Sequence, residues 1–85
     1  MPLIVEFFGI PRQRACVPSI VLQEADLPGT LGQLWNQLQT QFPQLDAALL
    51  PHLAVNFDGQ RFVQDPQTAL HGVRHVLVMS ADAGG

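Results

Sequence analysis

The sequence contains no lysine, and its four basic side chains are all arginines. With a formal net charge of −3, it lacks the basic surface by which proteins bind nucleic acid. No run of about eighteen apolar residues is present, so no membrane-spanning helix is expected. The absence of lysine has a second consequence. If the C-terminal carboxylate were activated, it could not form an amide with a side-chain amine of the same chain, and the α-amino group would be the chain's own amine acceptor.

Cysteine is almost absent, because Cys16 is the only one. One thiol cannot form an internal disulfide, and the first residues lack the basic region of a signal peptide, so a cytoplasmic protein is expected. No Ser/His/Asp arrangement, phosphate-binding glycine loop or zinc pattern occurs, and His52, His71 and His75 lack metal-ligand spacing. The sequence therefore predicts no metal site, no bound cofactor and no independent active site. Cys16 is expected to be an inert thiol.

Hydrophobic residues make up 47% of the 85 residues, which indicates one folded domain with a modest core. Alternation in the first expected strand assigns Leu3, Val5 and Phe7 to the core and the intervening residues to the opposite face. Residues 9–14 are expected to form a turn, and residues 24–29 a loop. Clusters of β-branched and aromatic residues predict strands over residues 3–8, 17–23, 53–57, 60–63 and 74–79.

The clearest helix is expected from Thr30 to Phe42. Thr30 and Gln33 fit a capping box, in which each side chain satisfies a backbone N–H group at the start of the helix. Pro43 is expected to end the helix. A short helical turn is expected over residues 45–50, and the pair Asp58-Gly59 favours a type I′ hairpin turn. The apolar stripe that is expected to face the core consists of Leu31, Leu34, Trp35, Leu38 and Phe42.

The expected order of elements is two strands, one helix and three further strands. The first and last strands are the most continuously apolar, which places them side by side at the centre of the sheet with the helix across them. The sequence thus predicts an α+β fold of the β-grasp type, with a mixed sheet of four to five strands and one main helix. We expect this domain to cover residues 1–79 and a flexible, extended C-terminal tail to cover residues 80–85.

The tail carries no large side chain and ends in Gly84-Gly85. Alone this pair is a weak signal, because about one chain in two hundred would end in two glycines by chance. Six extended residues reach roughly 20 Å, and glycine lets the walls of another protein close directly on the backbone. Gly85 can therefore enter a partner's pocket while the domain stays outside.

A second candidate site is a patch of exposed apolar side chains beside the tail. Phe8 and Met79 lie on the outward faces of strands that are expected to be neighbours, and Ile4 and Leu77 extend that face. Phe57 or Phe62 is expected to border it from the hairpin. Adjacent exposed apolar side chains on a small domain indicate a surface that docks a partner protein. The alternative is that a loop covers this face of the sheet.

These features together resemble the MoaD/ThiS family of ubiquitin-like sulfur carriers, in particular the small subunit of molybdopterin synthase. The resemblance covers essentially the whole chain and depends on the order and spacing of several short motifs. They are Val5-Glu6-Phe7-Phe8, Thr30-Leu31-x-x-Leu34, Leu53-Ala54-Val55-Asn56, Leu70-x-Gly72-x-x-x-Val76 and Gly84-Gly85.

The resemblance implies a carrier and not an enzyme. A ubiquitin-activating-type adenylating enzyme would use ATP to adenylate the carboxylate of Gly85, with Gly84 beside it. Sulfur from a persulfide donor would then displace AMP and leave a thiocarboxylate on Gly85. In the molybdopterin branch, the large synthase subunit accepts this end, and the sulfur passes to the pterin precursor. Phe8 and Met79 align with the family's hydrophobic docking surface, with Phe62 as a further member.

That branch usually has aromatic residues and a Pro-Pro pair before the diglycine, whereas residues 78–81 are Val-Met-Ser-Ala here. Three alternatives therefore stay open. The chain could carry sulfur for thiamine, cysteine or another metabolite. It could be a ubiquitin-like modifier that is joined to lysines of target proteins. It could also be a non-catalytic β-grasp interaction module whose tail has no role.

Overall fold

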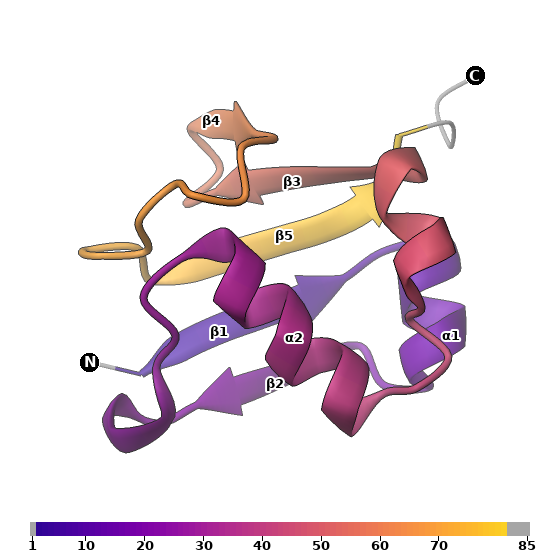
Figure 1. Ribbon diagram of the computed structural model, residues 1–85, viewed down its shortest axis with the longest axis horizontal. Coiled ribbons are helices and arrows are strands. Elements are labelled where there is room, and N and C mark those ends of the chain that lie inside the picture. The colour runs from indigo at the N-terminus through magenta and orange to yellow at the C-terminus, as the bar shows by residue number, and fades with distance from the viewer. Residues whose placement is uncertain (1, 82–85) are drawn as a thin grey trace.

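Five strands form one mixed sheet in the computed structural model, which describes residues 2–81 (Figure 1). The sheet order is β2-β1-β5-β3-β4. β1 and β5 run parallel side by side, and the other neighbouring pairs are antiparallel. This confirms the α+β, β-grasp arrangement with adjacent first and last strands. The strands are β1 (Leu3–Phe7), β2 (Ser19–Leu22), β3 (Leu53–Phe57), β4 (Arg61–Val63) and β5 (His75–Ser80).

The main helix, α2 (Leu31–Gln41), crosses one face of the sheet (Figure 1). At its start, the Thr30 hydroxyl accepts a hydrogen bond from the Gln33 N–H at 3.2 Å, as the capping box predicted. The reciprocal bond differs, because Gln33 Oε1 accepts from the N–H of Gly29, one residue before the cap, at 2.7 Å. The helix ends at Gln41 with Phe42 as its C-cap, directly before Pro43, as expected.

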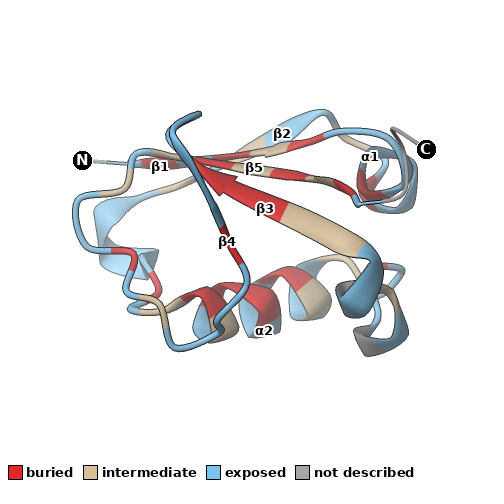
Figure 2. Cartoon of the chain, turned by 90° about the horizontal axis from the view of Figure 1, so that it is seen from above, coloured by how far each residue is buried: buried red, intermediate tan, exposed pale blue. Residues whose placement is uncertain are grey.

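The core lies between α2 and the inner face of the sheet, where the buried residues of both layers meet (Figure 2). Four residues of the predicted stripe are buried, and Phe42 is partly buried with its ring edge-on to Phe7 at 5.8 Å. Burial of a side chain as large as Phe7 contributes about 2–3 kcal/mol to stability. The core assignment of β1 is confirmed, because Leu3, Val5 and Phe7 are all buried.

A short helix, α1 (Ile10–Ala15), replaces the turn that we expected over residues 9–14. Gly9 enters it with φ of 65°, and Cys16 ends it in the left-handed conformation. The prediction of a turn at Pro11 was wrong, because proline is also favoured in the first turn of a helix, where its missing N–H is not needed. The helix lies beside the end of β5 from which the chain continues to the tail (Figure 1).

Several other boundaries differ from the predictions by one or a few residues. The expected loop over residues 24–29 contains a 3₁₀ turn, η1 (Glu24–Asp26). The helical turn expected over residues 45–50 is a second one, η2 (Ala47–His52), and it includes Pro51. β2 and β4 are shorter than predicted, and β5 begins and ends one residue later.

Candidate docking face and the root of the tail

The sheet has one face covered by α2 and one face that carries no helix among the described residues (Figure 2). We call the second face the open face. Its apolar side chains alternate with core residues along each strand, and Phe8 and Ile4 are each 40% exposed while Phe62 is 68% exposed. The five residues that the sequence assigned to a docking patch, Ile4, Phe8, Phe62, Leu77 and Met79, all lie on the open face, and Val21 joins them.

Strand register brings these residues together in rows across the sheet. Phe8 lies one residue past β1, and its N–H donates to the carbonyl of Val78 at 2.8 Å, which holds Phe8 next to Met79. Met79 pairs with Ala54 on its other side. This row of Phe8, Met79 and Ala54 lies at the end of the sheet where β5 finishes. The apolar part of the open face therefore reaches the point where the chain leaves the sheet.

An inserted residue in the β3–β4 hairpin determines where Phe62 points. Both central residues of the turn have positive φ, 58° and 72°, as the Asp-Gly pair predicted. The N–H of Gln60 donates to the carbonyl of Phe57 at 3.0 Å, but the strand register pairs Phe57 with Arg61. Gln60 is therefore an extra residue, and a shift of one residue exchanges the faces of a strand. The shift turns Phe62 to the open face, and the alternative residue for this position, Phe57, is wrong because it is buried in the core.

Polar groups on the open face were not assigned a role from the sequence. His75 Nε2 lies 2.6 Å from Glu6 Oε1, and both side chains are partly exposed. Asn56 pairs with Phe62 on one side and Leu77 on the other, yet it is only 7% exposed. Its position between the core residues of β3 is the sequence signal that could have placed it on this face.

The end of β5 determines where the chain leaves the domain. We call Ser80 and Ala81 the root of the tail. Ser80, which we placed at the start of the tail, is the last residue of β5 and is buried. The N–H of Ala81 donates to the carbonyl of His52 at 2.7 Å, so the backbone is tied to η2 one residue further. The predicted reactive residues, Gly84 and Gly85, lie outside the described residues.

Other candidate chemistry is sparse in the described part of the chain. Residues 2–81 hold no group of three or more His, Cys, Asp or Glu side chains that could bind a metal ion. Cys16 is exposed, and its Sγ lies 3.4 Å from the carbonyl oxygen of Gln13. Across the same residues, no helix is long and apolar enough to cross a membrane.

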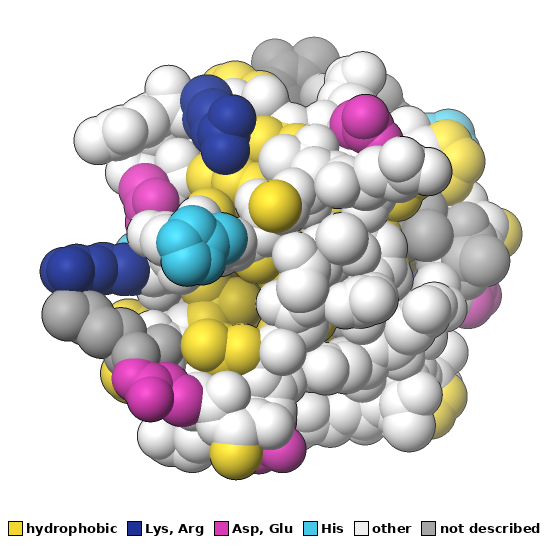
Figure 3. Space-filling model, turned by 60° about the vertical axis from the view of Figure 1, so that its left-hand side comes forward, with side chains coloured by type: hydrophobic (Ala, Val, Ile, Leu, Met, Phe, Trp, Pro, Cys, Tyr) yellow, Lys and Arg dark blue, Asp and Glu magenta, His cyan; other side chains and the backbone are white. Residues whose placement is uncertain are grey.

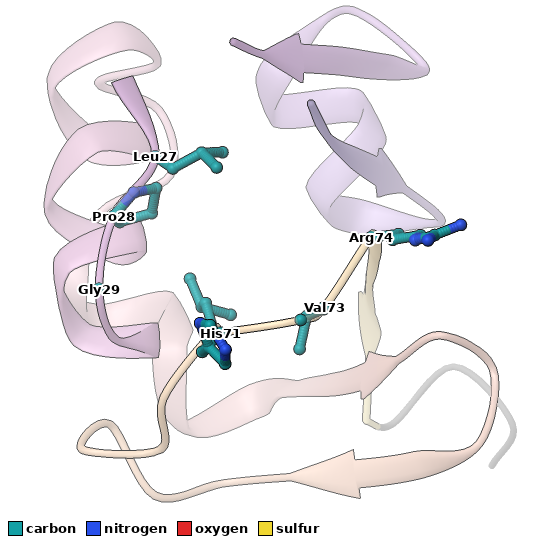
Figure 4. A pocket seen from close by; sticks show the side chains of 8 residues that line it. Leu27, Pro28, Gly29, His71, Val73 and Arg74 are labelled. Carbon is teal, nitrogen blue, oxygen red and sulfur yellow. The ribbon is translucent and has the colours of Figure 1, made fainter. Parts of the chain in front are cut away.

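A concave site lies at the opposite end of the sheet from the tail. Figure 3 shows hydrophobic side chains gathered in a hollow beside a histidine, with basic side chains at its edges. One hollow of about 470 Å³ opens between the segment before α2 and the loop that leads into β5, with Leu27 and Val73 on its two sides (Figure 4). The hollow lies at the start of β5, and Ser80 lies at the other end of the same strand. Its lining is Leu27, Pro28, Gly29, Leu70, His71, Gly72, Val73 and Arg74.

Two solved structures from Haloferax volcanii resemble this fold along the whole chain. SAMP1 aligns over 100% of both chains, with a TM-score of 0.76 and 15% sequence identity. The HVO 2177 protein aligns over 100% of this chain and 87% of its own, with a TM-score of 0.75 and 27% identity. No family model matches the sequence, and no curated protein is significantly similar to it. On this evidence the chain has the ubiquitin-like β-grasp fold.

Proposed function

We propose that this chain is a sulfur carrier and that the carboxylate of Gly85 is its working group. The carboxylate attacks the α-phosphate of ATP in an adenylating partner, which releases pyrophosphate and leaves an acyl-adenylate. The terminal sulfur of a persulfide then displaces AMP. A thiol reduces the resulting acyl disulfide, and the products are a disulfide and the thiocarboxylate on Gly85. The chain is substrate and carrier in this sequence of steps, and the partner is the enzyme.

The observation that carries the proposal is the continuity between the open face and the root of the tail. The row of Phe8, Met79 and Ala54 lies at the end of β5, and Ala81 is tied to the carbonyl of His52 beside it. Apolar side chains exposed in such a patch mark a surface that binds another protein. A partner that covers this row is therefore already next to the residues that lead to Gly85.

The length of the tail supports joint recognition of the face and the C-terminus. Four residues follow Ala81, and a fully extended chain of that length spans at most about 14 Å. An active site that holds Gly85 must therefore lie close to the domain. The adenylating partner would bind the open face and the tail at the same time, and the free energy of docking would help to position the carboxylate.

For the destination of the sulfur, we propose the pterin precursor of the molybdenum cofactor. The chain would then be the small subunit of molybdopterin synthase, and its large subunit would accept the thiocarboxylate. The support is the resemblance of the motifs in β1, α2 and β3 to that branch. Carriers for thiamine or cysteine share the same chemistry, and a protein modifier shares the adenylation step.

Complementation of pathway-specific mutants tests this proposal. The full chain should restore molybdenum cofactor formation in a strain that lacks its own small subunit, and the chain without Gly84-Gly85 should not. If the chain instead restored growth of a thiamine or cysteine mutant, that pathway would be identified as the destination of the sulfur. High-mass conjugates that require Gly85 would identify a modifier. Restored cofactor formation by the truncated chain would contradict carrier chemistry.

A further inference from the structure

The side chain of Asn56 carries an unsatisfied acceptor on the open face. Its Oδ1 is fully buried and has no hydrogen-bond partner in the described part of the chain. Most buried polar side-chain atoms in native proteins are paired with protein or ordered water. Burial of an unpaired acceptor costs free energy, so its presence in the sheet requires a reason that folding alone does not supply.

The position of Asn56 in β3 shows that its side chain lies on the open face of the sheet. Val55 and Phe57 on either side of it are buried in the core, so the alternation of β3 turns Asn56 to the open face. It lies between Phe62 on β4 and Leu77 on β5, one row away from Met79. Its direct neighbours on both adjacent strands are apolar, and the pair of Glu6 and His75 lies beyond Leu77, so the acceptor has the apolar flanks and polar rim of an interface centre.

Of the two neighbours of Asn56, Phe62 is the one whose side chain can change rotamer. Its side chain is 68% exposed, so little packing holds the ring in place, whereas Leu77 is half-buried between two strands. Rotation of an exposed aromatic side chain between staggered rotamers is inexpensive and fast. A donor group that arrives from solvent can therefore reach Oδ1 when the ring of Phe62 moves aside and packs against the arriving surface.

We propose that Asn56 Oδ1 is the hydrogen-bond acceptor by which the open face recognises the adenylating partner. This inference rests on the proposed function. The partner presents an apolar surface with one N–H donor, which enters beside Phe62 and bonds to Asn56. A partner surface that lacks the donor leaves Oδ1 unsatisfied in a drier environment, and this rejection gives the contact its specificity.

Replacement of Asn56 by leucine tests the inference, because leucine has a similar size and no polar atom. In the folded domain, Asn56→Leu should have the same or higher free energy of unfolding in urea than the unchanged chain. In titration calorimetry, its affinity for the adenylating enzyme of the same organism should fall about tenfold, the loss expected for one hydrogen bond in an interface. Asn36→Leu, on the exposed face of α2, is the matched control and should leave the affinity unchanged.

The possible outcomes distinguish failure of the proposed role of Asn56 from failure of the proposed function. Loss of folding stability in Asn56→Leu would assign Asn56 a structural role and overturn the inference. Unchanged or tighter binding would overturn it as well, while adenylation of Gly85 in the same samples would leave the carrier function standing. If the unchanged chain is neither bound nor adenylated, the proposed function fails and takes this inference with it.

Discussion

The side chains of Phe8 and Met79 lie on the open face and do not form part of the core. Phe8 is 40% exposed and is held beside Met79 by its N–H bond to the carbonyl of Val78. The core beneath is filled by their neighbours Phe7 and Val78, which are buried. The backbone thus fixes the position of both side chains, and their apolar atoms remain available to a partner.

Replacement of Phe8 by aspartate should weaken binding of the adenylating enzyme by more than about 1 kcal/mol, because a charge would be buried in the centre of the interface. The dissociation constant, measured by calorimetry, checks this. Leu27→Asp is the matched control, since Leu27 is equally exposed but borders the hollow at the far end of the sheet. A similar loss in both variants, or a large drop in melting temperature for Phe8→Asp alone, would contradict the assigned role.

At the scale of elements, the β3–β4 hairpin connects local turn chemistry to the shape of the site. Asp58 has φ of 58°, and its carboxylate accepts hydrogen bonds at 3.0 Å from the backbone N–H groups of Arg74 and His75. The turn therefore anchors the start of β5 as well as joining its own strands. Asparagine and aspartate are the residues other than glycine that best tolerate this conformation.

Asp58→Ala should lower the free energy of unfolding by about 2 kcal/mol, because it removes both hydrogen bonds and places alanine in a left-handed conformation. Asp58→Asn keeps an acceptor oxygen and the conformational tolerance, so we expect it to lose less than half as much. Urea unfolding of the two variants measures the difference. Equal losses would show that charge, and not the acceptor geometry, stabilises the turn.

The cap of α2 offers a second test of local stabilisation. Thr30→Ala should cost about 1 kcal/mol, because the N–H of Gln33 loses the hydroxyl to which it donates. Thr30→Ser retains a hydroxyl and should lose only a small part of that. Melting temperatures under the same conditions compare the two. If Thr30→Ala is as stable as the unchanged chain, the bond between Gln33 and Gly29 is sufficient for the cap.

Periodic patterns made the sheet and α2 predictable, and exceptions to simple patterns made the rest unpredictable. The stripe of α2 and the alternation of β1 follow from burial of one face, which dominates the energetics of both elements. α1 was missed because Pro11 is compatible with a turn and with a helix start. Phe62 lies on the open face, where the sequence had placed it as one of two candidates, but Gln60 was expected in the strand, and a single sequence carries little signal for the bulge that it forms.

The sequence placed the apolar members of the candidate docking face on the outer side of the sheet, where they lie, but did not single out Asn56. Ile4, Phe8, Leu77 and Met79 could be found because each alternates with a core residue in a long apolar strand. Asn56 could be placed on the same face by the same rule, but its unsatisfied acceptor depends on side chains from two neighbouring strands. Contacts between strands far apart in sequence are not visible in local periodicity.

For the whole molecule, the residues that fill the core and the residues proposed to bind a partner lie on opposite faces of the sheet. The core lies between α2 and the inner face of the sheet, the open face lies on the other side of the sheet, and the root of the tail lies at the end of β5 (Figures 1 and 2). Changes on the open face should therefore affect partner binding far more than folding. The absence of lysine fits the proposed function, because no side-chain amine of the chain can form an amide with its own activated end.

The mass of the intact chain after incubation with ATP, a persulfide donor, a reducing thiol and the adenylating enzyme of the same organism tests carrier chemistry most directly. We expect one oxygen to be replaced by sulfur, and we expect the replacement to be absent when Gly85 is deleted. A mass that does not change, with an enzyme shown to be active on its own carrier, would contradict the proposed function. The fold would then serve as a modifier or an interaction module.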